Sequence, residues 1–496
     1  MLGAPNRLRP DRGRALRTNT VGLDSRRGSC SVFFNRGIIS TQAIAHNLPK
    51  TKDGLPSSAV LKKRIQDPND PIRTRLVGDL AHGVLTLLDR AKKDGGECYC
   101  ALYELSDEEL IGRLKHLGKK AHIVLSNAGD DTEEGSGDGD STNQAARAEL
   151  HRLRLDVTDR MLKKGHIGHN KFVVYVDKDG PRAVLTGSTN WTATGLCAQS
   201  NNAIVIESPT LAADYLEYWK ALKKDTEGAD GDGSVLQAKD FRGGNRKAQS
   251  THDLTDGTGK AAGDVRVWFS PNTPQKSVPR KKKKGGGTVP PPSPPDVGQV
   301  FELIENARQG VLFLAFIPGN PSIVSKLKEV YDTRREAGKL FFLRGAATSP
   351  DPASVFRVNL YHRSARADAS VRGVDNPPDA AKASARVASV AGIYATFAQW
   401  EAELYKLGHA VIHDKILVID PFTDDSVVVT GSHNLGFKAS YSNDENLLII
   451  RNDRAVAEAY AAHVLDVYEH YRWRWRLQQP IRDEFQRLKD KHPGED

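Results

Sequence analysis

Two segments of the chain, residues 169–190 and 413–434, carry the same four polar residue types at the same spacings. These residues are His169, Lys171, Ser188 and Asn190 in the first segment and His413, Lys415, Ser432 and Asn434 in the second. Imidazoles can serve as nucleophiles or as acids and bases, while ammonium, hydroxyl and amide groups can bind phosphate oxygens. Gathered around one pocket, the two sets would form a preorganised cage for a phosphate whose negative charge grows in the transition state.

The apolar runs that follow each histidine predict how these side chains are positioned. FVVYV and ILVI are typical of buried strands, in which alternate residues point to the same side. We therefore expect His169 and Lys171 to project together, with Phe172 and Val174 facing the other way. A single His-x-Lys pair arises by chance in many proteins. Two pairs, each with a Gly-Ser step eighteen residues after the histidine, indicate an internal duplication.

Alternating helices and short apolar strands on both sides of the chain's centre predict an α/β fold with mixed central sheets. In the first half the pattern predicts helices at 72–93, 106–117 and 209–223 and strands at 97–103, 120–126, 169–176 and 182–187. In the second half it predicts helices at 298–308, 321–336 and 453–478 and strands at 311–317, 339–345, 413–419 and 426–430.

Composition shifts along the chain predict five regions. The predicted regions are an Arg-rich, partly disordered N-terminal arm at 1–70, a first catalytic half at 71–222, a Gly/Pro/Lys-rich linker with a short strand at 223–297, a second catalytic half at 298–480 and a C-terminal tail at 481–496. An insertion at 346–400 precedes the second motif, and we expect it to form part of the mouth of the pocket.

The overall composition limits the class of protein and partner. A formal charge of +9 favours a polyanionic partner, either nucleic acid or an anionic membrane surface. No run of apolar residues is long enough to span a bilayer and no signal peptide is evident, so we expect a cytoplasmic or peripheral membrane protein. Four cysteines are too few for a disulfide framework and lack zinc-site spacing. With both halves in one chain, we expect a monomer.

The paired motifs resemble those of the phospholipase D superfamily, whose signature is HxKxxxxD followed by GSxN, present twice. The second copy matches in full, including Asp420. The resemblance implies two α/β/α sandwich halves related by a pseudo-twofold axis, and a two-step mechanism that uses no metal or cofactor. One histidine attacks phosphorus to give a phosphohistidine, and the other protonates the leaving oxygen and then activates water or an alcohol.

The first copy departs from this signature at two positions. Val176 stands where the motif has its acid, and Asp177 follows one residue later. Thirty-two residues after the histidine, the second copy has Glu445, an acid that can support an imidazole, whereas the first copy has Asn201. Either the two histidines have specialised roles or the first half has decayed. We favour specialisation, with Asp177 and Asn201 as possible supporting residues.

Resemblance and local chemistry favour different histidines as the nucleophile. The family's N-terminal histidine is usually the nucleophile, which indicates His169, with His413 as general acid and base. Pairing of His413 with Glu445 would instead make His413 the better supported imidazole. We adopt the first assignment, and expect catalysis to depend on both histidines, Lys171, Lys415, Asp420 and Glu445.

Three functions remain open at this stage. The chain could be a phospholipase D-like hydrolase or transphosphatidylase, a nuclease that cleaves DNA or RNA, or a catalytically degenerate scaffold that binds phosphate. Intact His/Lys pairs in both halves argue against the scaffold. The motifs do not separate phospholipid from nucleic acid, since both are phosphodiesters, and we favour the phospholipid.

Overall fold

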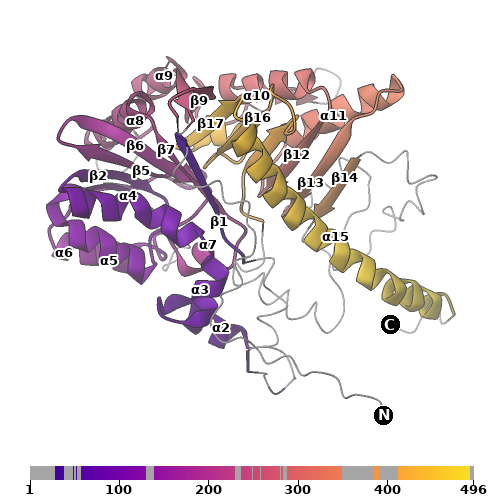
Figure 1. Ribbon diagram of the computed structural model, residues 1–496, viewed down its shortest axis with the longest axis horizontal. Helices are drawn as coiled ribbons and strands as arrows, with labels where there is room; N and C mark the ends of the chain where they lie inside the picture. Colours follow the sequence, from indigo (N-terminus) through magenta and orange to yellow (C-terminus); the bar gives the residue numbers. More distant parts are fainter. Residues whose placement is uncertain are drawn as a thin grey trace, which may run out of the picture.

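The computed structural model describes residues 28–37, 48–49, 52, 57–129, 139–229, 236–247, 250–256, 258–279, 281–282, 288–348, 385–389 and 412–491. Most of the predicted insertion at 346–400 lies outside these residues. Within them, two mixed α/β halves stand side by side, indigo to magenta for the first and orange to yellow for the second (Figure 1). The predicted fold class is confirmed.

The first sheet has seven strands in the order β1-β7-β6-β5-β2-β3-β4. Their bounds are β1 Cys30–Phe34, β2 Glu97–Leu102, β3 Ala121–Ser126, β4 Asp156–Arg160, β5 Lys171–Asp177, β6 Gly180–Gly187 and β7 Asn202–Glu207. β2, β3 and β4 run parallel to one another, and the remaining neighbours pair antiparallel. The central strands are buried on both faces, which accounts for their nearly continuous apolar sequences.

The second sheet has eight strands in the order β14-β13-β12-β15-β16-β17-β9-β8. Their bounds are β8 Thr251–Thr255, β9 Ala261–Ser270, β12 Gly310–Ala315, β13 Phe342–Ala347, β14 Ala385–Ser389, β15 Ile416–Ile419, β16 Val427–Gly431 and β17 Glu445–Arg451. Six consecutive strands repeat the order and direction of β4-β3-β2-β5-β6-β7, and β9 lies against β17 as β1 lies against β7. The duplication predicted from the motifs is thus visible in the topology.

The two sheets share a central hydrophobic core and each has a further core on its other face. The shared core joins inward-facing residues of both sheets to α8 (Pro209–Glu227) and α15 (Arg454–Lys491). α4 (Leu80–Asp94) and α5 (Glu108–Leu117) cover the other face of the first sheet. α10 (Pro295–Asn306) and α11 (Ile323–Glu336) cover that of the second sheet. Phe172 and Val174 lie in the shared core and Val173 in the outer one, as strand alternation predicts.

The remaining α-helices in the described part of the chain are short, with at most nine residues each. They are α2 Ser58–Gln66, α3 Pro71–Val77, α6 Gln144–Arg152, α7 Ala193–Cys197, α9 Lys239–Lys247 and α14 Phe437–Ser442. The predicted helix at 72–93 is two helices, α3 and α4, because Gly78 adopts a positive φ of 54° between them. Strands β4, β7 and β17 were not predicted at all.

Both halves begin earlier in the chain than the composition predicted. β1 falls within the predicted N-terminal arm, yet it forms the edge of the first sheet against β7. β9 falls within the predicted linker, yet it pairs along its length with β17 in the second sheet. These two strands occupy equivalent positions, so each half recruits a strand from the segment that precedes it.

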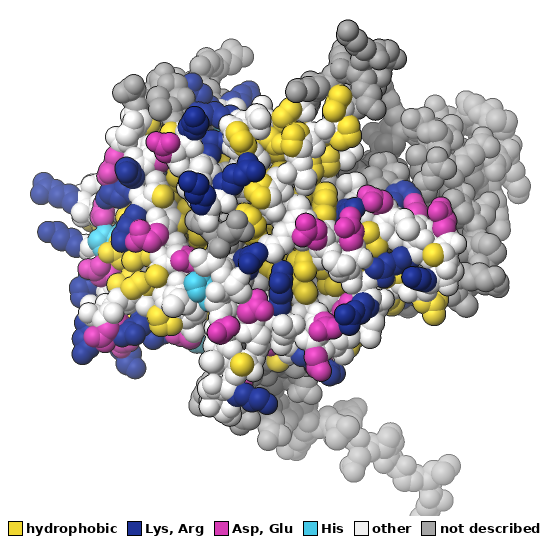
Figure 2. Space-filling view, turned by 90° about the horizontal axis from the view of Figure 1, so that it is seen from above, with side chains coloured by type: hydrophobic (Ala, Val, Ile, Leu, Met, Phe, Trp, Pro, Cys, Tyr) yellow, Lys and Arg dark blue, Asp and Glu magenta, His cyan; other side chains and the backbone are white. Residues whose placement is uncertain are grey.

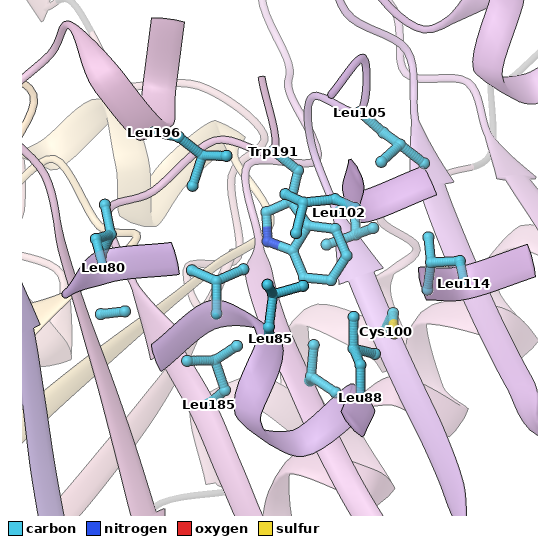
Figure 3. Packing of buried hydrophobic residues seen from close by; sticks show 14 of the residues in the cluster. Leu80, Leu85, Leu88, Cys100, Leu102, Leu105, Leu114, Leu185, Trp191 and Leu196 are labelled. Carbon is cyan, nitrogen blue, oxygen red and sulfur yellow. The ribbon is translucent and has the colours of Figure 1, made fainter. Parts of the chain in front are cut away.

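Trp191, which directly follows the first GSxN segment, is a core residue. Its side chain is 2% exposed and packs among leucines of α4, β2 and β6. Figure 3 shows the indole at the centre of this cluster, between Leu85, Leu102 and Leu105. The indole is therefore part of the hydrophobic core of the first half.

Candidate functional site

The two motif histidines meet where the halves join. The ring centroids of His169 and His413 are 6.4 Å apart, with an interplanar angle of 67°. Both side chains are buried, at 3% exposure. Each stands just before a central strand, β5 or β15, so the strands deliver the two imidazoles to one place from opposite halves. A single phosphorus atom can therefore lie within reach of both rings.

Each imidazole is supported by a residue of the other half. His169 Nδ1 lies 2.9 Å from Glu445 Oε2 and 3.1 Å from the carbonyl oxygen of Ser432. His413 Nδ1 lies 2.9 Å from Asn201 Oδ1. The expected pairing of His413 with Glu445 within one half is therefore wrong. The support crosses between the halves because Asn201, directly before β7, and Glu445, the first residue of β17, each face the histidine of the neighbouring half.

The orientation of the Asn201 amide is set by its other hydrogen bonds. Its Nδ2 donates to the carbonyl oxygen of Gly195 at 2.8 Å, while its Oδ1 accepts from Ser188 Oγ at 2.8 Å. The oxygen thus faces His413, whose Nδ1 must carry a proton to donate to it. His169 Nδ1 likewise faces only acceptors. In both rings Nε2 is left as the free nitrogen, which is the atom available for chemistry.

The lysines lie beside their histidines, as the two-residue spacing predicts. Lys171 Nζ donates to the carbonyl oxygen of His169 at 2.6 Å, and Lys415 Nζ makes the equivalent bond to His413. Each ammonium also lies over an aromatic ring, Tyr103 at 5.0 Å and Phe316 at 5.1 Å. These aromatics follow β2 and β12, and each also contacts the histidine of its own half.

Both GSxN segments form tight turns against the adjacent strand. Gly187 and Gly431 have φ of 144° and 127°, and a Cβ on either would lie within 2.5 Å of a backbone oxygen of the neighbouring strand. Only glycine fits there. Ser188 Oγ accepts from the backbone N–H of Asn202, and Ser432 Oγ from that of Asn446, both at 3.0 Å.

The two asparagines that close the GSxN segments have free acceptor atoms. Asn190 Nδ2 donates to Glu104 Oε2 at 2.6 Å, whereas its Oδ1 is buried without a hydrogen-bond partner. Asn434 Oδ1 is also buried and unpartnered. Because buried polar atoms in proteins are nearly always hydrogen-bonded, these two oxygens are candidates to contact a bound molecule.

Burial and neighbouring charges shift the pKa values of all the ionisable groups in this cage. Burial lowers the pKa of His169 to about 4, with Glu445 opposing the shift and Lys171 reinforcing it. Burial and the two lysines hold the pKa of His413 well below its ordinary value. Burial lowers the pKa of Lys171 to about 7 and that of Lys415 well below its usual range. Burial and the lysines therefore favour the neutral form of both imidazoles.

The motif acids lie away from this cage. Asp420 stands at the opposite end of β15 from Lys415, about 16 Å along the strand, and its carboxylate accepts from the backbone N–H groups of residues 308–310. Asp177 stands at the far end of β5 and forms an ion pair with Arg182. The structure therefore does not place Asp420 or Asp177 in the cage, because a strand separates each acid from its histidine.

The residue between histidine and lysine in each motif links the halves further. Asn170 Oδ1 accepts from Asn446 Nδ2 at 3.1 Å, and Asp414 Oδ1 accepts from Asn202 Nδ2 at 2.8 Å. His463 of α15 also contacts Asp414, at 2.9 Å. This hydrogen-bonded seam fixes the two strand ends against each other and hence the separation of the two imidazoles.

Several residues around the site were not predicted from the sequence. They are Tyr103 and Phe316 beside the lysines, Glu104 beside Asn190, and Asn202 and Asn446 in the seam. Tyr103 and Phe316 could have been found by aligning the two halves, since each directly follows its half's first apolar strand. Asn202 and Asn446 each lie thirty-three residues after their histidine. His166 and His409 lie three and four residues before the motif histidines. His166 contacts Gln237 and the carbonyl oxygen of Ser442, and His409 lies outside the described residues.

Among the residues that the structure describes, no group of three or more His, Cys, Asp or Glu is arranged to hold a metal ion. Within the same part of the chain, no helix has the length and apolarity needed to cross a bilayer. What the site offers is two imidazoles and two lysines, a set suited to binding and attacking a phosphate diester.

The chain matches the family described as cardiolipin synthase, PLD-like domain, over residues 84–223 and 363–465. It is 41% identical over 71 residues to a phospholipase D of Rickettsia conorii, a match that covers 14% of this chain and 32% of that protein. The chain thus spans about a third of the length of that curated relative.

Solved structures with similar folds are more distant. Polyphosphate kinase from Porphyromonas gingivalis aligns with a TM-score of 0.44 at 11% identity, over 85% of this chain and 56% of that one. Phosphatidylserine synthase from Haemophilus influenzae aligns with a TM-score of 0.46 at 11% identity, over 79% and 85%. Nuc of Salmonella typhimurium, a phospholipase D family member, aligns with a TM-score of 0.22 at 22% identity, over 29% and 86%.

Proposed function

Since the chain belongs to the phospholipase D superfamily, we propose that it cleaves a phosphodiester, by preference a phospholipid, through a covalent phosphohistidine. The observation that carries this proposal is the 6.4 Å separation of the His169 and His413 rings, each held by a residue of the opposite half. Such an arrangement lets one imidazole attack phosphorus while the other serves the leaving oxygen.

In the first step His169 Nε2 attacks phosphorus and the bond to the leaving alcohol breaks. The attacking ring becomes positively charged as the N–P bond forms, and Glu445 stabilises that charge through Nδ1–H. His413 donates its proton to the departing oxygen. Its partner Asn201 is neutral and leaves its imidazolium more acidic than a carboxylate partner would, which suits a proton donor.

Binding of the substrate prepares His413 for this role. Burial and the two lysines disfavour a protonated His413. A diester anion between Lys171 and Lys415 offsets their charge, so its arrival raises the proton affinity of the ring. In the second step neutral His413 takes a proton from water or an alcohol, whose oxygen attacks phosphorus, and the N–P bond breaks to release His169.

The two halves are thus assigned unequal roles, with His169 as nucleophile and His413 as general acid and base. The crossed support removes the conflict between resemblance and local chemistry, since the carboxylate belongs to His169. Asn201 is then a positioning residue adapted to the acid and not a sign of decay. This argues against a degenerate scaffold.

An assay panel containing EDTA tests the proposal. Wild type, His169→Ala, His413→Ala and the exposed control His116→Ala are compared on bis-p-nitrophenyl phosphate, phosphatidylcholine, phosphatidylglycerol and single-stranded DNA. We expect turnover by wild type and the control, with a loss of at least about a thousandfold in either active-site variant. Activity abolished by EDTA, or retained in both active-site variants, would refute the mechanism.

Trapping the intermediate tests the assignment of roles. In His413→Ala the first step can proceed with a p-nitrophenol leaving group, which needs no acid, but hydrolysis stalls. Acid-labile, base-stable phosphate is expected on His169. Label found on Ser188 or Ser432 would overturn the covalent step, and label on His413 in His169→Ala alone would reverse the roles.

A further inference from the structure

A carboxylate without a counterpart in the second half stands beside the phosphate cage. Glu104 follows Tyr103 at the end of β2, and its Oε2 accepts from Asn190 Nδ2 at 2.6 Å. The equivalent residue after Phe316 is Ile317, which is apolar and 50% exposed. The duplicated site is therefore acidic on one wall and apolar on the other, and neither proposed step uses this acid.

The wall formed by Glu104 and Asn190 presents only hydrogen-bond acceptors. The Asn190 side chain is 3% exposed, its Nδ2 is occupied by Glu104 and its Oδ1 has no partner. An ionised carboxylate and an amide oxygen call for a donor, and a cationic donor makes the strongest bonds to them. Phosphate oxygens, which are acceptors themselves, cannot fill this place.

The charges of the cage lead to the same conclusion. With both imidazoles neutral, the cage carries no net charge only when Lys171 and Lys415 are protonated and Glu445 and Glu104 are ionised. A diester adds one negative charge to this buried balance, and a cation on the same substrate restores it. Uncompensated buried charge is costly. Burial raises the pKa of the Glu104 carboxyl, although the lysines oppose the shift, so the acid gains from a cationic partner.

We propose that Glu104 and Asn190 form a subsite for an ammonium group carried by one alcohol of the substrate, so that the enzyme selects zwitterionic phosphodiesters such as those with ethanolamine head groups. This inference rests on the proposed function and narrows its substrate. Nucleic acid is disfavoured, because every internal phosphodiester of a strand is flanked by further phosphates, which Glu104 would repel. On the face seen in Figure 2, acidic and basic side chains are interspersed and form no single basic stripe for such a strand.

Two chromogenic diesters with a common leaving group test the subsite. p-Nitrophenyl phosphorylethanolamine and p-nitrophenyl propyl phosphate differ only in an ammonium group against a methyl group. We expect wild type to favour the former by roughly ten- to a hundredfold in kcat/KM, as for a hydrogen bond to a charged group. Glu104→Gln keeps an acceptor for Asn190 but removes the charge, and should bring the ratio near one.

Two further variants keep the test decisive. Glu108→Gln, the same substitution at an exposed site on α5, should leave the ratio as in wild type. Glu104→Asp retains the charge at a greater distance and should give an intermediate ratio. It provides a second test of the subsite should Glu104→Gln fail to fold.

The outcomes separate the subsite from the proposed function. A wild-type ratio near one, or a ratio unchanged in both Glu104 variants, overturns the subsite, while turnover itself upholds the proposed function. Failure of wild type on every diester would instead refute the proposed function. Wild type that prefers single-stranded DNA to phosphatidylethanolamine in mixed micelles also overturns the subsite.

Discussion

His169 of the first half and Glu445 of the second share a buried 2.9 Å contact between Nδ1 and Oε2. The carboxylate is fully enclosed, and its other oxygen accepts from Asn443 Nδ2 at 3.1 Å. Burial alone would raise the pKa of Glu445, but its interaction with His169 and nearby cations holds it below the ordinary value. The group therefore remains ionised and available to stabilise a positive imidazole.

Single substitutions of Glu445 and Asn201, which support the two imidazoles, should affect the two chemical steps differently. Glu445→Gln removes the charge that stabilises the attacking ring, so we expect kcat to fall by roughly a hundredfold or more. Asn201→Asp gives His413 a carboxylate and makes its imidazolium a weaker acid. Its defect should be largest with poor leaving groups and small with p-nitrophenol. Equal losses in both variants, regardless of leaving group, would contradict the assigned roles.

The crossed support explains which part of the site could be predicted from the sequence. Strand alternation was enough to place His169 beside Lys171, and equal spacing was enough to reveal the duplication. Asn201 and Glu445 lie at the same distance from their own histidines, so spacing cannot tell whether they serve the near or the far ring. That depends on the contacts that Asn202 of β7 and Asn446 of β17 make with the opposite half across the seam, which is a tertiary relationship.

The motif acid shows a different failure. Asp420 lies five residues beyond Lys415, and a strand of that length carries its end far from the lysine. The predicted strand thus conflicts with a direct catalytic role for Asp420, which only the family resemblance implies. β1 was missed, and β9 was predicted only as a short strand of the linker, because strands inside polar, Gly-rich surroundings have little periodicity of their own.

The basic limb of the pH profile should report Lys171. Its pKa is lowered to about 7 by burial, with Glu445 and Glu104 opposing the shift. The ammonium form binds the diester and is lost as pH rises through this value, so kcat/KM on bis-p-nitrophenyl phosphate should fall above about pH 7. In the enzyme–substrate complex the bound diester anion favours the ammonium form of Lys171. The basic limb of the pH profile of kcat should therefore lie at a higher pH than that of kcat/KM. A kcat/KM that keeps rising beyond pH 8 would contradict this.

Asp420 should matter for stability and not for the chemical step. Its carboxylate accepts from three backbone N–H groups at the start of β12, at 2.7 to 2.9 Å. Asp420→Asn tolerates the residue's positive φ of 47° but replaces an acceptor by a donor facing those groups. We expect the free energy of unfolding to fall by about 1–3 kcal/mol, measured by urea titration. The kcat of the folded variant should stay within about twofold of wild type; a hundredfold loss would restore a catalytic role.

The seam should hold the two halves together through coupled polar contacts. Asn446 Oδ1 accepts from Thr186 Oγ1 at 2.7 Å across the seam, and both side chains are buried. A double-mutant cycle of Asn446→Ala with Thr186→Val should give a coupling energy of at least about 0.5–1 kcal/mol. Asn446→Ala paired with Thr333→Val, on the exposed face of α11, provides the matched control and should couple negligibly. If Asn446 and Thr186 couple no more strongly than the control pair, the halves are held by apolar packing alone. Some feature other than the seam would then have to set the separation of the two imidazoles.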